Sequence, residues 1–369
     1  MALNLKHQKI CFVISAFSTG GVNRVIANIA NECIKRGLSI DVVALSSMPN
    51  ESRQIFSNKT NLHSLGWPRT ISFIPLWRFF RKNRKYDGII SAVEFVNLHT
   101  IIASKLAKAQ ASLIVTTHTD LTEERKQLKS QILNIVYALA SRAYPLADYI
   151  CAVSQGVAQS LSRELKLQES GIKVINNPIV DKNYTELKPE IPHNWYKEDI
   201  PVIVGCGRLT PQKNFVLLIN AFAKLLKKQP ARLILLGDGK QKKLLKQHIQ
   251  ALNIGCNVYL AGDVSNPLDY FYYSRMFVLS SMWEGFGNVI VEALSMGCPI
   301  ISTNCPSGPS EILEDGKWGK LVKMNDEAAL TKAMLSELQN KKEARTYLRN
   351  RADFFNIQDI TNQYLSLLR

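Results

Sequence analysis

The sequence has no long apolar run, no paired cysteines and no metal-binding spacing. No stretch reaches the roughly 18 consecutive apolar residues of a membrane-spanning helix, and the N-terminus lacks a signal-peptide pattern. The seven cysteines are scattered without a CxxC, and none of the six histidines stands at metal-ligand spacing from a cysteine or carboxylate. We therefore expect a cytoplasmic chain, soluble or peripheral on a membrane, with no disulfide framework, no metal and no cofactor.

A complete dinucleotide fingerprint is missing as well. The pattern G-x-G-x-x-G is absent at the Gly20-Gly21 turn, and in GCGRLT the third glycine position is taken by Thr210. The Gly237–Gly239 turn fails in the same way, because Lys242 stands at the third position. Adjacent glycines at a strand end still let a backbone approach a ligand closely, although a plain flexible turn is an equal alternative for Gly20-Gly21.

What the chain does have is length and positive charge. Its 369 residues are enough for two domains of ordinary size, and the net charge is +16. The charge is uneven, since residues 1–177 hold 22 basic against 11 acidic side chains and the remainder holds 24 against 19. The first half is therefore expected to face something anionic.

Apolar strand-like runs alternate with helical segments in both halves, which predicts two doubly wound α/β domains. We place an N-terminal domain at 1–180, a linker at 181–199, a second domain at 200–350 and a C-terminal helix at 351–369. The clearest predicted strands are Lys9–Ala16, Gly88–Ala92, Ala111–Thr117, Asp148–Ser154, Ile200–Gly207, Ala231–Gly239, Asn257–Gly262 and Met276–Ser280.

The most informative stretch is Ser281 to Ser302, SMWEGFGNVIVEALSMGCPIIS. It places Glu284 in a glycine-rich turn and Glu292 inside the following helix, for which Asn288 suits the N-cap position. The amides of 286–288 then point out of a helix N-terminus, which favours phosphate, and the two carboxylates suit the hydroxyls of a vicinal diol. Considered alone, either glutamate is equally explained as a solvated side chain.

Two cations lie close together in the turn after the first strand of the second half. Arg208 and Lys213 are five residues apart in GRLTPQKNF, and a helix is predicted to begin near Asn214. An arginine fork and a lysine point charge on one loop would neutralise a diphosphate. The alternative for each residue alone is solvated surface.

The two glutamates separated by seven residues inside EGFGNVIVEALSMGCPII resemble the signature of glycosyltransferase family 4. Members of this family are retaining enzymes of the GT-B fold. The resemblance therefore implies two facing Rossmann-like domains with a cleft between them, and a C-terminal helix that crosses back to the first domain. The sequence also resembles bacterial enzymes that build surface polysaccharides and lipid-linked oligosaccharides.

The resemblance also implies roles for individual residues. It gives Arg208 and Lys213 as diphosphate ligands, Glu284 as the ligand of the sugar hydroxyls, and His118, in VTTHTDL, as a contact of the donor sugar. These four form the expected catalytic set. The expected donor-binding set is Gly21, Arg208, Lys213, Gly285, Phe286, Gly287, Asn288 and Glu292.

Residues 66–86, GWPRTISFIPLWRFFRKNRKY, interleave aromatic and basic side chains. Such a stretch suits an anionic membrane surface. The alternative is that the aromatic side chains pack on the sheet while the basic ones face water. Both interpretations stay open at this stage.

The function that the sequence predicts is retaining transfer of a sugar from a nucleoside diphosphate, UDP being expected, to a saccharide acceptor. Transfer is expected to be metal-independent, with the acceptor attacking on the face that the leaving group departs from. The acceptor is expected to be lipid-linked or a lipopolysaccharide, on the inner face of the cell membrane. Alternatives are a sugar-nucleotide epimerase of the same fold and a non-enzymatic basic module for membranes or nucleic acid, although no nucleic-acid recognition motif is present.

Overall fold

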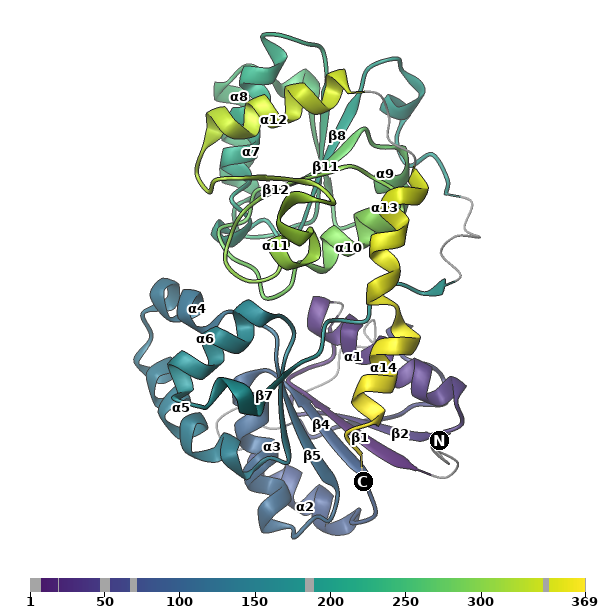
Figure 1. Cartoon of the computed structure of the whole chain (residues 1–369), viewed down its shortest axis with the longest axis vertical. Coiled ribbons are helices and arrows are strands. Elements are labelled where there is room, and N and C mark those ends of the chain that lie inside the picture. Colours follow the sequence, from purple (N-terminus) through teal and green to yellow (C-terminus); the bar gives the residue numbers. More distant parts are fainter. Residues whose placement is uncertain are drawn as a thin grey trace. The chain divides into compact units, whose positions relative to one another are not determined.

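The computed structural model describes residues 8–18, 20–46, 54–66, 72–182, 189–340 and 345–368. The chain forms two compact units, Met1–Ile179 with Ile357–Arg369, and Val180–Asn356. Each unit is built around its own parallel sheet (Figure 1).

The first unit contains a seven-stranded parallel sheet in the order β3-β2-β1-β4-β5-β6-β7. The inner strands are apolar and buried on both faces, as expected for a sheet covered by helices on each side. The strands are β1 (Lys9–Ile14), β2 (Ser39–Ala44), β3 (Asn61–Ser64), β4 (Gly88–Ala92), β5 (Ser112–Thr117), β6 (Tyr149–Ala152) and β7 (Ile172–Val174).

Helices of the first unit form two packed groups. The first consists of α1 (Gly21–Lys35) and α14 (Ile357–Leu365), which contact each other. In the second, α2 packs on α3, α3 on α5, and α6 on both α4 and α5 (Figure 1). Its members are α2 (Phe73–Lys82), α3 (Glu94–Leu106), α4 (Leu121–Leu128), α5 (Gln131–Ala143) and α6 (Gln155–Leu165).

The second unit contains a six-stranded parallel sheet in the order β10-β9-β8-β11-β12-β13. Its strands are β8 (Val202–Cys206), β9 (Arg232–Leu236), β10 (Val258–Gly262), β11 (Met276–Leu279), β12 (Ile300–Thr303) and β13 (Lys320–Val322). Its helices are α7 (Phe215–Leu226), α8 (Lys242–Ala251), α9 (Pro267–Tyr273), α10 (Asn288–Ser295), α11 (Pro309–Ile312), α12 (Glu327–Gln339) and α13 (Arg345–Ala352). The predicted pair of Rossmann-like sheets is thus confirmed.

Helix α10 begins one residue earlier than predicted. The N-cap is Gly287, with φ +98°, and Asn288 is already the first helical residue. A left-handed cap is a conformation that glycine adopts without the steric cost that asparagine would meet, so the expected N-cap role of Asn288 is wrong. The helix ends at the C-cap Met296, and the next residue, Gly297, has φ +66°, a left-handed conformation that glycine commonly adopts after a helix.

The C-terminal segment is two helices with a 3-10 turn, Asp353–Phe355, between them. Helix α13 belongs to the second unit, and α14 belongs to the first, where it packs on α1. Arg36 Nη2 donates to the carbonyl of Gln358 over 2.9 Å and so anchors α14. The predicted return of the C-terminal helix to the first unit is confirmed.

The aromatic and basic segment 66–86 is described except for residues 67–71. Within α2, Phe80 is buried, and the ring of Phe79 contacts the rings of His63 and Tyr86. The Phe73 ring stacks on His99 of α3. Most of the described aromatic side chains therefore pack inside the unit, while the basic side chains of this segment are exposed. In the described part of the chain, no helix has the length and apolarity needed to cross a bilayer.

Candidate functional site

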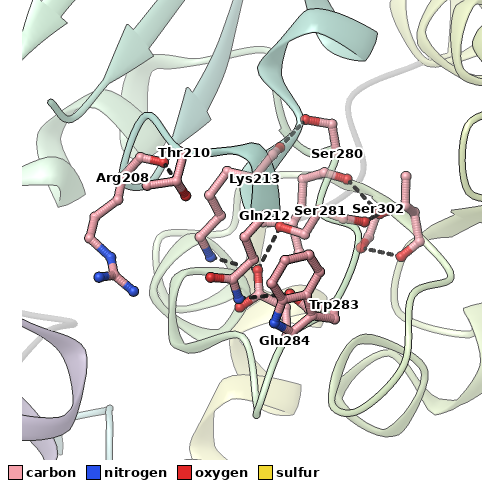
Figure 2. Close-up of polar contacts among 11 residues, drawn as sticks. Arg208, Thr210, Gln212, Lys213, Ser280, Ser281, Trp283, Glu284 and Ser302 are labelled. Carbon is pink, nitrogen blue, oxygen red and sulfur yellow. Dashed lines mark hydrogen bonds and ion pairs between the residues drawn. The ribbon is translucent and has the colours of Figure 1, made fainter. Parts of the chain in front are cut away.

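The centre of the candidate site is an ion pair between Lys213 and Glu284. Lys213 ends the 3-10 turn Pro211–Lys213 after β8, and Glu284 stands in the turn after the neighbouring strand β11. Lys213 Nζ lies 2.6 Å from Glu284 Oε1, and the two side chains are only 14% and 8% exposed (Figure 2). Both residues follow the carboxyl ends of parallel strands, the edge at which such sheets bind ligands.

Hydrogen bonds hold the two turns together. Ser281 Oγ donates to the same Glu284 Oε1 over 2.6 Å, so this oxygen accepts from two donors. Gln212 Nε2 donates to the carbonyl of Trp283 over 2.9 Å (Figure 2). The Met282 N–H donates to the Gln212 carbonyl over 2.8 Å. The Glu284 carboxylate is therefore preorganised. Sequence reasoning missed Ser281 and Gln212, although both are polar neighbours of predicted site residues.

Arg208 differs from Lys213 in its surroundings. Its side chain is exposed and makes no hydrogen bond or ion pair with any residue that the structure describes. Figure 2 shows its guanidinium extending away from the Lys213–Glu284 pair. One loop thus carries a cation already engaged by a carboxylate and a second that faces solvent.

The turn between Glu284 and α10 presents backbone donors. The N–H groups of Phe286 and Gly287 have no hydrogen-bond acceptor among the described residues, and both precede the first residue of α10. Unpaired amides at a helix N-terminus favour an anion, since the dipole adds to the donors. Three more predicted donor-binding residues lie in this turn and helix: Gly285 precedes Phe286, Asn288 is the first residue of α10, and Glu292 is half-buried on α10.

The turn is supported from behind by the loop after β12. A side chain on Gly308 would place its Cβ 1.8 Å from the Phe286 carbonyl oxygen, and Gly308 has φ +107°. The Glu284 N–H also donates to the Pro306 carbonyl over 3.1 Å. The close approach explains why glycine occupies this position, directly before Pro309, the first residue of α11.

The Phe286 side chain points into the second unit. Its ring meets the ring of Phe355 edge-to-face at 5.4 Å, and the Arg351 guanidinium lies 5.0 Å from the same Phe355 ring. Arg351 Nε donates to the Ile312 carbonyl at the end of α11 over 2.7 Å. The C-terminal part of this unit therefore contacts both the turn between Glu284 and α10, which we call the donor turn, and the helix α11 beside it.

His118 belongs to the first unit and directly follows β5. Thr116 donates its single hydroxyl proton to the Ser91 carbonyl over 2.8 Å, so it accepts from His118 Nε2, 3.0 Å away. This leaves Nδ1 as the unprotonated nitrogen, and it has no partner among the described residues. Burial lowers the His118 pKa to about 4, so the ring is neutral at physiological pH and presents an acceptor.

Gly21 is the first residue of α1 and follows the N-cap Gly20. The turn that leads to it is tied down by Asn23, whose Nδ2 donates to the carbonyls of Ala16 and Ser18 over 2.7 and 3.1 Å. Asn23 was not a predicted site residue. Its signal in the sequence is a polar side chain in the first turn of an otherwise apolar helix face.

A further buried group at the same sheet edge is Glu94, the first residue of α3. Its Oε1 has no partner among the described residues, and the preceding Val93 has φ +81°, a strained conformation for a β-branched residue. Burial, followed by the charge of Glu124, raises the Glu94 pKa to about 8. Across the described ranges there is no group of three or more His, Cys, Asp or Glu able to hold a metal ion.

Comparison with known proteins supports the resemblance read from the motifs. Residues 19–182 match the family model "Glycosyltransferase Family 4", and residues 188–353 match "Glycosyl transferases group 1". An uncharacterized glycosyltransferase of Methanocaldococcus jannaschii is 30% identical over 277 residues, covering 72% of this chain and 67% of the relative. The chain belongs to glycosyltransferase family 4. This glycosyltransferase moves a sugar from a nucleotide-sugar to an acceptor, a conclusion that sets aside the epimerase and the non-enzymatic alternatives.

Relatives and solved structures extend over nearly the whole glycosyltransferase. A Campylobacter jejuni N-acetylgalactosamine-N,N'-diacetylbacillosaminyl-diphospho-undecaprenol 4-alpha-N-acetylgalactosaminyltransferase is 26% identical over 356 residues, 92% of this chain and 93% of the relative. HepE of Anabaena in complex with UDP-glucose superposes with a TM-score of 0.82 at 22% identity, over 98% of this chain and 99% of HepE. The apo lipopolysaccharide outer core galactosyltransferase WaaB superposes with a TM-score of 0.73 at 18% identity, over 98% and 99%. These structures share the GT-B fold predicted for this chain.

Proposed function

We propose that this glycosyltransferase moves a sugar from a UDP-sugar, with retention of the anomeric configuration, to a lipid-linked or lipopolysaccharide saccharide at the inner face of a bacterial membrane. Support for UDP comes from HepE, whose structure was solved with UDP-glucose. Support for the acceptor comes from the Campylobacter relative, whose name specifies an undecaprenol-linked glycan, and from WaaB, a lipopolysaccharide galactosyltransferase.

The observation that carries the proposal is the combination of cations and unpaired amides on two neighbouring turns. As the bond from the anomeric carbon to the diphosphate breaks, negative charge grows on the leaving group and must be stabilised. Lys213 and Arg208 supply positive charge, and the N–H groups of Phe286 and Gly287 supply oriented donors. Residues of this chain alone are thus proposed to receive the diphosphate, without a metal.

Glu284 and Lys213 act as one unit in this proposal. An ammonium group has three protons, so Lys213 retains donors for a phosphate oxygen while it bonds Glu284 Oε1. The ion pair also holds the Glu284 carboxylate in place, and the acceptor sites that Lys213 does not use are proposed to accept hydrogen bonds from sugar hydroxyls. Glu292, one helix further, is proposed to accept from the ribose diol.

The first unit contributes His118 and Gly21 to the proposal. The buried Nδ1 of His118, which has no partner among the described residues, is proposed to accept from a donor-sugar hydroxyl, and Gly21 is proposed to let the α1 turn approach the phosphates closely. No carboxylate is assigned as a nucleophile. The acceptor hydroxyl is proposed to attack on the face that UDP leaves, so the new glycosidic bond forms as the old one breaks, and the acceptor proton passes to the departing diphosphate.

The test is turnover of radiolabelled UDP-sugars by the purified enzyme. We expect slow hydrolysis of one UDP-sugar without acceptor, and fast transfer when an undecaprenyl-diphosphate-linked saccharide is added. NMR of the product should show the anomeric configuration of the donor. Activity with a different nucleotide only, an inverted product, or full activity in both Lys213→Ala and Glu284→Ala would overturn the proposal.

A further inference from the structure

An aliphatic stripe on α5 is exposed to solvent. Ile132, Ile135 and Leu139 are 74%, 59% and 49% exposed, and their i, i+3, i+7 spacing places them on one side of the helix. The opposite side of α5 is fixed by buried Tyr137 and Ala140. The three side chains of the stripe therefore take no part in packing α5 against the rest of the unit.

Exposed aliphatic residues also occur on neighbouring elements. Ile102 and Leu106 of α3 are exposed one turn apart, and exposed Leu128 ends α4 just before α5. Helices α3 and α5 pack on each other, and α2 packs on α3, so these elements form one layer of the first unit (Figure 1). Exposed aliphatic residues gathered in one layer indicate an interaction surface rather than chance exposure.

The same layer carries charge of one sign. Segments 72–86, 95–119 and 125–147 contain no Asp or Glu. The nearest carboxylates on α4 are engaged, because Glu123 pairs with Lys126 at 2.6 Å and Glu124 accepts from Tyr137 Oη at 2.9 Å. Exposed cations of the layer include Arg78, Lys82, Lys105, Lys108, Lys129 and Arg142.

We propose that this layer docks on an anionic lipid surface, with the α5 stripe inserted among the lipid chains and the surrounding Lys and Arg at the headgroups. Aliphatic side chains bordered by cations and free of carboxylates match the two components of such binding, burial of apolar area and attraction to anionic lipid. The inference deepens the proposed function, since it concerns how the enzyme meets a membrane-resident acceptor.

Two other occupants fit this surface less well. A second copy of the chain in a two-fold dimer would bring the same face against itself, so that cations would meet cations without a carboxylate to pair them. Single-stranded nucleic acid would use the charge but has no need of exposed isoleucine and leucine, and base stacking requires exposed aromatic rings. The lipid surface is the partner that uses both features.

The surface also refines the role predicted for residues 66–86. The rings of Phe79 and Phe80 pack inside the unit, so α2 contributes exposed Arg78, Arg81 and Lys82 to the layer, and α5 contributes the inserting side chains. Neither α3 nor α5 lies in the segment that the sequence singled out. Their contribution depends on exposure, which only the fold determines.

The experiment is flotation of the full-length enzyme with vesicles of phosphatidylcholine alone or with 30% phosphatidylglycerol, without donor or acceptor. We expect binding to the anionic vesicles only, weakened in 0.5 M NaCl. The triple variant Ile132→Ser, Ile135→Ser, Leu139→Ser should partition at least about tenfold more weakly, because apolar burial in the bilayer is lost. Leu244→Ser, at a 48% exposed residue of α8, is the matched control and should bind like the wild type.

Folding and function are followed separately. The three side chains are exposed, so unfolding of the triple variant and its slow hydrolysis of a UDP-sugar without lipid should match the wild type. Unchanged lipid binding in the triple variant would overturn the inference, as would a wild-type dimer that the variant converts to monomer without loss of lipid binding. Wild-type vesicle binding without turnover of any UDP-sugar would refute the proposed function and leave the lipid surface standing.

Discussion

Lys213 and Glu284, 71 residues apart in the sequence, share a 2.6 Å contact between Nζ and Oε1 in a nearly solvent-free position. Removing one member leaves a buried, uncompensated charge, whereas removing both leaves none. We therefore expect Lys213→Met to lower the free energy of unfolding by about 3 kcal/mol, and the double variant with Glu284→Gln to recover most of that loss.

Activity should respond differently from stability. Each single variant and the double variant are expected to lose at least about a hundredfold in kcat/KM, because a site that stabilises the leaving group loses its charge. Urea unfolding and UDP-sugar turnover on the same preparations separate the two effects. A stable double variant that retains turnover would show that the pair is structural.

Gly308→Ala is expected to displace the Phe286 turn. The added Cβ would stand 1.8 Å from the Phe286 carbonyl oxygen, and a positive φ adds strain, so we expect a cost of roughly 1–3 kcal/mol in stability and a raised KM for the nucleotide-sugar. The control is Gly255→Ala, where no atom lies within 4 Å of the new Cβ. Equal KM values in the two variants would contradict the supporting role of this loop.

Ionisation of His118 should not change kcat/KM between pH 5.5 and 8. Its pKa lies at about 4 because burial disfavours the charged ring, so it is neutral across this range. His118→Leu should lower kcat/KM by roughly tenfold or more, through loss of the Nδ1 acceptor, without changing the shape of the profile. An ionisation near pH 6.5 that disappears in the variant would disprove a neutral His118.

Glu94 should make the protein less stable as the pH rises. Its folded-state pKa of about 8 exceeds the ordinary value of 4.5, so the unfolded chain loses a proton that the folded chain keeps. The contribution of Glu94 to stability is full below pH 4.5 and falls between pH 4.5 and 8, by an amount on the order of 5 kcal/mol. Glu94→Gln should remove this slope in thermal unfolding followed from pH 5 to 8. The same slope in both proteins would exclude Glu94 as its source.

The sequence predicted the two sheets, and it predicted the turns that carry the candidate site residues, because both depend on local patterns. Buried strands are continuous apolar runs, and Glu284, Lys213 and the α10 N-terminus lie in recognisable turns. The pairing of Lys213 with Glu284 was beyond local reasoning, since it arises from β8 and β11 being neighbours in the sheet. The exposure of the α5 stripe and the packing of Phe79 also depend on which elements become neighbours in the fold, so local patterns could not predict them.

The position of Phe355 ties the donor turn to residues that a sequence-based domain boundary would discard. Its ring meets Phe286, and its carbonyl accepts from the N–H of Val180, the first residue of the second unit, over 3.0 Å. A second unit expressed alone and ended at residue 350 would keep Lys213, Glu284 and α10 yet lack the aromatic backing of the turn. Fragments for ligand-binding studies should therefore extend to Asn356.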